Sequence, residues 1–363
     1  MRREKNYLVY LVVLILSFSI IITSTTFSYG QNSEDSDIEN CSQNSIDEIL
    51  NSDEPANSVH FYDNMKNFHH IKKYDKKGNL LDSWGLKGIE PGKFLHPHGI
   101  AVDHLGNVYV SDAVKCNIQK FDSDGNFITQ WGERGTGPGQ FLQPEGIAID
   151  SSNNVFVADY RNQHIQKFDS NGKFITMWGS KGKGPNQFVK PWGISVDSHD
   201  NIYVADQENP YIQKFDNNGN YLSRFGSYGS GPGQFVHLHD VFVDKDDNIY
   251  TTDGRENSRI TKFDSNNNFI KMWGSEGKDF GEFKEPHGLL VDSKDSVYVV
   301  DTRNNRIQKF SSDSEFVDSW GNKLGCDDKQ FMLIHDMAFD PEENIYISDS
   351  GNVHFRSNIV CDK

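Results

Sequence analysis

Residues 144–179 read PEGIAIDSSNNVFVADYRNQHIQKFDSNGKFITMWG. This stretch holds four short runs rich in Val, Ile and Phe, and they are separated by Asn, Asp and Gly residues typical of tight turns. The pattern recurs every 47 or 48 residues, as six aromatic-Gly pairs show at Trp84, Trp131, Trp178, Phe225, Trp273 and Trp320. Four strands in a repeat of this length, with no helical period, predict an all-β, six-bladed β-propeller of four-stranded blades.

The two ends of the repeat region resemble complementary halves of one blade. At the N-terminal end, residues 71–74 and 80–84 match the third and fourth strands of the unit. At the C-terminal end, residues 337–339 and 345–347 match the first and second strands. Pairing of these halves would close the ring and remove two exposed sheet edges. We therefore predict a propeller over residues 59–355 and a tail over 356–363. Ile359-Val360 also resembles a third strand and competes for that position.

The N-terminus has the features of a secretory signal. Three basic residues lie within the first five, residues 8–22 are almost wholly apolar, and small residues occupy positions around 28–30. This pattern predicts a signal peptide over residues 1–30 and a secreted or extracytoplasmic protein. An uncleaved anchor helix is the alternative, for which an apolar run of about 15 residues is short. Residues 31–58 are polar and acidic, and we expect them to form a flexible leader.

Net charge limits the kinds of partner that the protein can bind, and the cysteines bear on the cellular compartment. The formal net charge is −16 at pH 7, and an acidic surface repels phosphate groups. Nucleic acids are therefore excluded as partners, membrane contact is expected only through an uncleaved N-terminal segment, and we expect a monomer. Export would place the cysteines where disulfides persist. Three pairings stay open among Cys41, Cys116, Cys326 and Cys361.

Three strings carry a resemblance to a known family. They are PHGIAVD at Pro97–Asp103, NVYVSD at Asn107–Asp112 and RIQKF at Arg306–Phe310. This pattern resembles the NHL repeat and covers roughly residues 71–349 in six copies. The resemblance implies a six-bladed propeller. It leaves the function open, because NHL proteins include protein-binding, RNA-binding and enzymatic members.

One aspartate recurs at the end of the second predicted strand of every blade. A lone buried carboxylate could be catalytic, but a carboxylate present in all blades is better explained as an acceptor for backbone N–H groups of the loop that follows. The residues concerned are Asp112, Asp159, Asp206, Asp253, Asp301 and Asp349. Functional residues are instead expected where one loop-rich face departs from the repeat.

Histidines gather at one variable position of that face, the residue before the repeated Gly. In blade order the position holds His98, Glu145, Trp192, His239, His287 and His335. His96 and His237 lie two residues before two of these. A single such His would be an ordinary polar group in a wet channel. Several at one depth around the axis also fit a metal or ligand site, because neutral imidazole is a common metal ligand.

A second resemblance concerns the strings FLHPHGI at Phe94–Ile100, PHGL at Pro286–Leu289 and HDM at His335–Met337. They are similar to peptidyl-α-hydroxyglycine α-amidating lyase, a six-bladed enzyme. The resemblance implies zinc held by His at this position in alternate blades, with a Tyr and an Arg nearby. Tyr160 is the candidate Tyr, and the candidate arginines are Arg161, Arg255 and Arg303.

Alternation between blades defines two candidate ligand sets. The set Glu145, His239 and His335 offers two imidazoles and a carboxylate, and the carboxylate would favour iron or manganese over zinc. The other set combines His98 and His287 with Trp192, which cannot ligate a metal. In that case His98 and His287 would support the site or bind a ligand directly.

Two function classes follow. The first, which the sequence favours, is a secreted binding module that offers a protein, peptide or glycan the contacts Trp192, Tyr160, Arg161, Arg255 and Arg303. The second is a metal-dependent lyase or hydrolase at the channel mouth.

Overall fold

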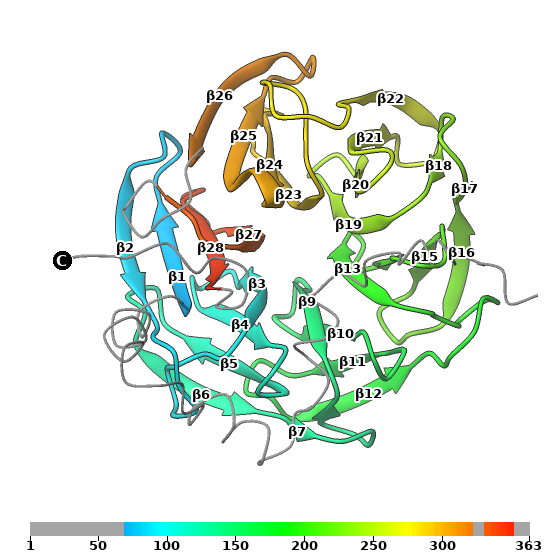
Figure 1. Ribbon diagram of the computed structural model, residues 1–363. Helices are drawn as coiled ribbons and strands as arrows, with labels where there is room; N and C mark the ends of the chain where they lie inside the picture. The colour runs from blue at the N-terminus through cyan, green and yellow to red at the C-terminus, as the bar shows by residue number, and fades with distance from the viewer. Residues whose placement is uncertain (1–68, 322–329, 352–363) are drawn as a thin grey trace, which may run out of the picture. The chain divides into compact units, whose positions relative to one another are not determined.

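The computed structural model describes residues 69–321 and 330–351. These residues belong to one compact unit and form six four-stranded antiparallel sheets arranged as blades around a central axis (Figure 1). The predicted all-β six-bladed propeller is confirmed. Among the described residues the single helical element is the 3-10 turn η2, Thr302–Asn304, and none of them forms a helix suited in length and apolarity to crossing a membrane.

Five blades are each built from four consecutive strands. They are β3 Pro97–Val102, β4 Val108–Asp112, β5 Asn117–Phe121 and β6 Phe127–Trp131; β9 Pro144–Ile149, β10 Val155–Asp159, β11 His164–Phe168 and β12 Phe174–Trp178; β13 Pro191–Val196, β14 Ile202–Asp206, β15 Ile212–Phe215 and β16 Tyr221–Phe225; β19 Leu238–Val243, β20 Ile249–Asp253, β21 Arg259–Phe263 and β22 Phe269–Trp273; β23 Pro286–Val291, β24 Val297–Asp301, β25 Arg306–Phe310 and β26 Phe316–Gly321. Two short parallel pairs lie in connecting loops: β7 Glu133–Arg134 with β8 Gln140–Phe141, and β17 Ser227–Tyr228 with β18 Gln234–Phe235.

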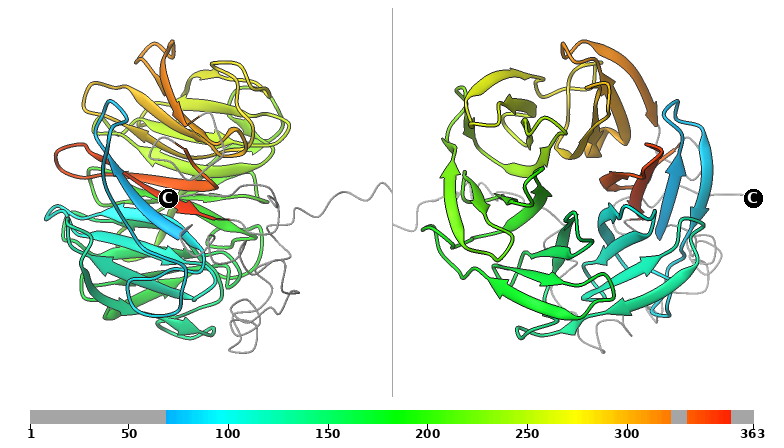
Figure 2. Two further views of the ribbon diagram at one scale, coloured as in Figure 1. Left: turned by 60° about the vertical axis from the view of Figure 1, so that its left-hand side comes forward. Right: turned by 180° about the vertical axis from the view of Figure 1, so that it is seen from behind.

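The remaining blade is shared by the two ends of the described chain. β27 Ile334–Phe339 and β28 Ile345–Ser350 supply its inner strands, and β1 His69–Tyr74 and β2 Leu80–Trp84 supply its outer strands. β1 pairs with β28 over six residues, from His69 opposite Ser350 to Tyr74 opposite Ile345. The blue and red strands that lie side by side in Figure 2 are this sheet. The predicted closure is confirmed, with β1 in the third-strand position; Ile359-Val360 lies outside the described residues.

Each blade is held to the next by aromatic side chains. Trp178 of β12 lies between Phe156 of its own blade, 6.1 Å away between ring centroids, and Phe215 of the following blade, 5.8 Å away. The hairpin glycine Gly219 of that following blade has φ +85°, and a Cβ there would lie 2.5 Å from the indole ring. The Trp-Gly pairs therefore mark contacts between blades, where large aromatic areas are buried.

The repeated aspartates accept backbone hydrogen bonds and connect two loops on one face, whereas the prediction named only the loop that follows each aspartate. Asp112 accepts hydrogen bonds from the backbone N–H groups of Leu95 (2.7 Å) and His96 (3.0 Å), which precede the inner strand. It also accepts from Val114 (3.1 Å) and Lys115 (2.9 Å), which follow β4. Equivalent bonds to the loop before the inner strand are made by Asp159, Asp206, Asp253, Asp301 and Asp349. The loops of this face are thereby held rigid.

Several predictions fall outside the described residues. They concern the signal peptide, the leader, the C-terminal tail and the outermost residues of the range 59–355. Cys116, the last residue before β5, is disulfide-bonded. The other three cysteines lie outside the described residues, so the pairing stays open.

Candidate functional site

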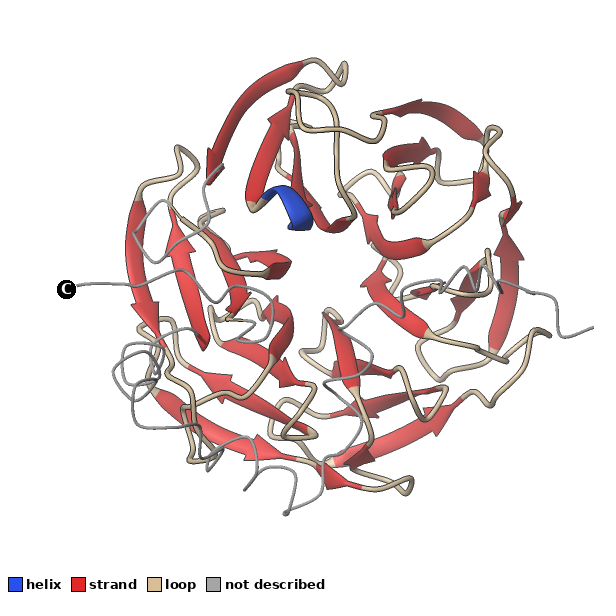
Figure 3. Ribbon diagram, in the orientation of Figure 1, coloured by secondary structure: helices blue, strands red, loops and turns tan. Residues whose placement is uncertain are grey.

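The six inner strands bring one residue of each blade to the channel mouth. β3, β9, β13, β19, β23 and β27 surround the axis, with η2 beside the inner end of its blade (Figure 3). The second residue of each inner strand is the variable position: His98, Glu145, Trp192, His239, His287 and His335. All are buried except Trp192, which is half-buried. The histidines of the sequence pattern therefore lie in one ring of side chains.

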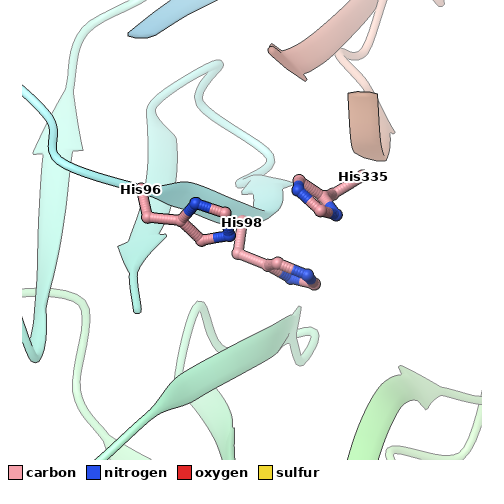
Figure 4. A group of neighbouring side chains, drawn as sticks. All are labelled: His96, His98 and His335. Carbon is pink, nitrogen blue, oxygen red and sulfur yellow. The ribbon is translucent and has the colours of Figure 1, made fainter. Parts of the chain in front are cut away.

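One histidine group on the first and closing blades converges most closely. Ring centroids of His98 and His335 are 4.2 Å apart, and those of His96 and His335 are 5.1 Å apart. Each of the three residues has a ring nitrogen within 4.8 Å of the others, which is true of no other His, Cys, Asp or Glu trio within 69–321 and 330–351. Figure 4 shows the three rings side by side. We name His96, His98 and His335 the first histidine cluster.

A chain of polar side chains orients His98. Its Nδ1 is 2.7 Å from Oε2 of Glu145. The other carboxylate oxygen of Glu145 accepts a 2.5 Å hydrogen bond from Nε2 of Gln143, and the side-chain oxygen Oε1 of Gln143 accepts one of 2.6 Å from Nε of Arg161. Glu145 and Arg161 thus act on the same histidine, and the Glu145 carboxylate fixes the orientation of its ring.

A second group of histidines lies on the fourth and fifth blades. Ring centroids are 4.6 Å apart for His237 and His239 and 4.1 Å apart for His239 and His287. The two groups meet where Nδ1 of His287 lies 3.5 Å from Nδ1 of His335. We name His237, His239 and His287 the second histidine cluster. Together the clusters form a continuous run of imidazoles.

Burial keeps five of the clustered imidazoles neutral. Desolvation, with smaller effects of neighbouring charges, lowers the pKa of His96 and that of His239 to about 3. The same causes lower the pKa values of His237, His287 and His335 well below the usual range. Neutral imidazole is the form that coordinates a metal ion. At neutral pH the rings are ready to act as ligands.

Aromatic and cationic side chains border the clusters. Trp192 contacts His98, His239 and His287 at ring separations of 5.0, 5.4 and 5.7 Å, and Tyr160 packs edge-on against it at 5.4 Å. The Tyr160 hydroxyl donates a 3.3 Å hydrogen bond to Gln207. These rings give the mouth an apolar wall next to its nitrogen ligands.

The cations at the rim share one carboxylate. Arg303, in η2, is ion-paired with Glu285, and Nε of Arg255 is 4.0 Å from the same carboxylate. The side chains of Arg255 and Arg303 are 45% and 37% exposed. Both arginines act electrostatically on His239. They are therefore placed to attract an anionic group to the mouth.

Two aspartates line the channel below the histidines. A cavity of about 250 Å³ runs between the inner strands, and Asp240 and Asp336 stand in it where four other blades have Gly. Asp240 accepts from the backbone N–H of Leu289, and Asp336 from that of Ile100, each at 3.1 Å. Burial raises the pKa of Asp336 to about 6, and burial together with Asp336 raises that of Asp240.

The sequence matches a known propeller family over most of its length. The DUF5128 six-bladed beta-propeller family matches residues 38–169, 153–212 and 198–265, which together span more than half of the chain. The chain belongs to the DUF5128 propeller family. The NHL repeat also matches, at residues 283–310, which confirms the resemblance drawn from the repeated strings.

Solved structures share the fold of this DUF5128 propeller at low identity. A streptogramin B lyase is 11% identical with a TM-score of 0.54, over 78% of this chain and 95% of that one. Virginiamycin B lyase from Staphylococcus aureus is 15% identical with a TM-score of 0.50, over 70% and 78%. A gluconolactonase from Xanthomonas campestris is 13% identical with a TM-score of 0.52, over 71% and 88%. No curated protein sequence matches the chain.

The DUF5128 propeller groups the predicted ligands differently from the alternate-blade scheme. His98 lies next to His335 and His239 next to His287, while Glu145 is bonded to His98. Sequence reasoning did not include His96 or His237 among the ligands. Their signal was the His-X-His spacing, which places a second imidazole in the loop just before the inner strand. Gln143, Glu285 and the channel aspartates carried no signal beyond a departure from the repeat.

Proposed function

We propose that the first histidine cluster binds a divalent transition metal and that the protein is a metal-dependent lyase or hydrolase acting on a small substrate at the channel mouth. The observation that carries the proposal is the convergence of three imidazoles, from His96, His98 and His335, with ligand atoms within 4.8 Å of one another. Catalytic zinc is held by three protein ligands with one position open. The predicted export would place this chemistry outside the cytoplasm.

The surroundings of the cluster fit a metal site. The Nδ1 atom of His98 faces the Glu145 carboxylate, and metal-ligating histidines usually donate their second ring N–H to such a group. Nε2 of His335 is buried and has no hydrogen-bond partner in the described part of the chain. Three imidazoles suit zinc or iron better than the hard cations magnesium and calcium. Manganese would be favoured only if Glu145 left His98 and became a ligand.

The chain's own residues would position a substrate. A metal at this site would supply a Lewis acid for a carbonyl oxygen. The half-buried ring of Trp192, which touches His98, offers an apolar surface to the substrate. Arg255 and Arg303 would hold an anionic group at the rim. The Arg161–Gln143–Glu145 chain would fix the orientation of the His98 ring.

The fold neighbours support an enzyme by analogy. Two of them are named lyases and one a gluconolactonase. One solved structure is a catalytically inactive histidine-to-alanine variant of virginiamycin B lyase with quinupristin. A histidine is thus essential to chemistry on a propeller of this kind, although shared fold alone does not transfer activity.

Removal of a ligand should cost the protein its metal. We expect His96→Ala and His335→Ala each to lower the bound metal by about one equivalent per chain, because two remaining imidazoles hold a divalent ion weakly. The measurement is elemental analysis of protein purified without an affinity tag. His104→Ala, which changes an exposed histidine, is the control and should keep its metal. Unchanged metal in both ligand variants would overturn the proposal.

Metal binding should also persist in mild acid. A lowered pKa means that an imidazole stays neutral until the pH falls to that value, so protons compete with the metal only near pH 3 for His96, instead of near 6.5. Metal retained after dialysis at pH 7, 6, 5 and 4 measures this. We expect little loss at pH 5. Half-loss at pH 6 or above would contradict neutral, buried ligands.

A binding module is the second candidate, and the exposed rim favours it. Trp192 is half-buried and the two rim arginines are exposed, as contacts for a peptide or glycan would be. Screening of metal-free protein on peptide and glycan arrays separates the two functions. Binding that survives metal removal and disappears in Trp192→Ala would favour the module. If the metal-free protein binds neither peptides nor glycans, the binding module is contradicted and the metal-dependent enzyme is the remaining candidate.

A further inference from the structure

We infer that the channel mouth holds a second metal site, formed by His237, His239 and His287. The proposed function uses none of these residues as ligands, so the second site stands independently of it. Their exposed fractions are 4%, 1% and 2%. Buried imidazoles in mutual contact select a transition metal such as zinc or iron, since carboxylate and carbonyl ligands are what calcium and magnesium require.

The spacing of the rings suits a shared ion. Two nitrogens bound to one tetrahedral zinc at 2.0–2.1 Å lie roughly 3.4 Å apart. The centroids of neighbouring rings in the cluster are 4.1 Å and 4.6 Å apart. Because an imidazole nitrogen lies about 1.1 Å from the ring centre, these centroid distances are compatible with that separation between nitrogens of neighbouring rings.

The protonation of His239 leaves the correct nitrogen available. Its Nδ1 lies 3.0 Å from the carbonyl oxygen of Pro286. A carbonyl only accepts hydrogen bonds, so Nδ1 carries the proton and Nε2 keeps its lone pair. An N–H donated to a backbone carbonyl is the usual arrangement behind a metal-ligating histidine.

The ring of His239 rests directly on a glycine. A Cβ at Gly254 would lie 2.7 Å from Cε1 and 2.9 Å from Nδ1 of His239. Any side chain at position 254 would therefore push the imidazole away from Pro286. The glycine follows Asp253, which also holds the backbone N–H of His237 at 2.8 Å. The loops at this point are thus shaped around both histidines.

His237 supplies the independent sign of a missing ligand. Both of its ring nitrogens are buried, and neither has a hydrogen-bond partner among the residues that the structure describes. Buried polar groups are almost always satisfied, and an exception is explained by a bound ion, a bound water or a catalytic role. A metal ion shared with His239 and His287 would satisfy one nitrogen.

The two clusters are built alike. Each has a His-X-His segment at the start of an inner strand, His96-Pro97-His98 in one and His237-Leu238-His239 in the other. A third histidine comes from an adjacent blade, His335 or His287, and these two meet at 3.5 Å between their Nδ1 atoms. The nearby cations Arg255 and Arg303 act on His239. These arginines would repel a metal cation at the second site, so we expect the second site to fill after the first.

Cobalt titration of the full chain tests the second site. Co²⁺ is added to chelator-treated protein, and the bound equivalents are counted from visible absorption. We expect two equivalents in the unchanged protein, and one in both His237→Ala and His237→Gln. Gly254→Ala should weaken the second equivalent by about 10–100-fold, as for other changes behind a ligand. His104→Ala is the control, and thermal melting confirms that each variant folds.

The outcomes separate this inference from the proposed function. A single equivalent that is lost in His96→Ala but kept in His237→Ala would overturn the second site and leave the first. A single equivalent lost in His237→Ala and kept in His96→Ala would support the second site and overturn the first. No bound Co²⁺ in the unchanged protein would overturn both.

Discussion

Deletion of residues 69–84 is expected to abolish cooperative unfolding. These residues form β1 and β2, and without them the closing blade is reduced to the β27–β28 hairpin, which is marginal on its own. The deletion also removes Ile71 and Trp84 from the core between the closing and first blades. Lys72, whose Nζ is 3.0 Å from Oδ2 of Asp349, is lost as well. Calorimetry or circular dichroism on heating measures the transition.

The matched control is a chain that begins at residue 31, which keeps β1 and all four cysteines. It should melt as the full-length protein does, because it retains every strand of the closing blade. An unchanged melting curve after deletion of 69–84 would show that β1 and β2 do not hold the ring closed.

Trp178→Ala is expected to lower the free energy of unfolding by about 3–5 kcal/mol, as other buried aromatic-to-Ala changes do. The indole is 8% exposed and packs against aromatic rings of two blades. Its removal leaves a cavity between two blades, and neither sheet can move to fill this cavity without losing its contacts to the rest of the ring. Trp131, between Tyr109 and Phe168, should behave in the same way with a smaller loss, because it is only half-buried. Urea unfolding measures both.

Ile175→Ala provides the control for Trp178→Ala, since it changes the same strand on its outer face. Ile175 is 47% exposed, and surface substitutions usually stay within about 0.5 kcal/mol. Equal losses in the two variants would mean that the Trp-Gly pairs do not join the blades.

The fold could be predicted because the four strands of each blade repeat the same pattern of buried and exposed residues. The second strand is buried on both faces, as in β10, and so reads as a continuous apolar run. The outermost strand alternates, as in β12. Six copies of this contrast identify the blade, and the strand halves at the ends identify the closure. The strand patterns of one blade lie within about 50 residues of one another, and the ring closure follows from the repeat, so both can be recognised in the sequence alone.

The site could be predicted only in part. Repetition placed the variable residues in one ring, but the neighbours that each side chain touches depend on rotamers and on loops from other blades. Glu145 illustrates this. One of its carboxylate oxygens lies against His98 of the adjacent blade, and the other accepts a hydrogen bond from Gln143. Argument from six-fold symmetry treated the positions as equivalent. The side chains broke that symmetry and gave two groups on neighbouring blade pairs, one on the first and closing blades and one on the fourth and fifth.

The pairing of β1 with β28 has a consequence for biosynthesis. β1 and β2 leave the ribosome about 260 residues before their partner strand, β28, is made. At about 5–20 residues per second, that is a delay of roughly 13–50 s. Each of the other blades can form from a contiguous stretch of chain soon after it emerges, whereas β1 must wait with an unpaired edge that is open to wrong partners. The final assembly step therefore joins the first of the described strands to be made, β1 and β2, to the last, β27 and β28.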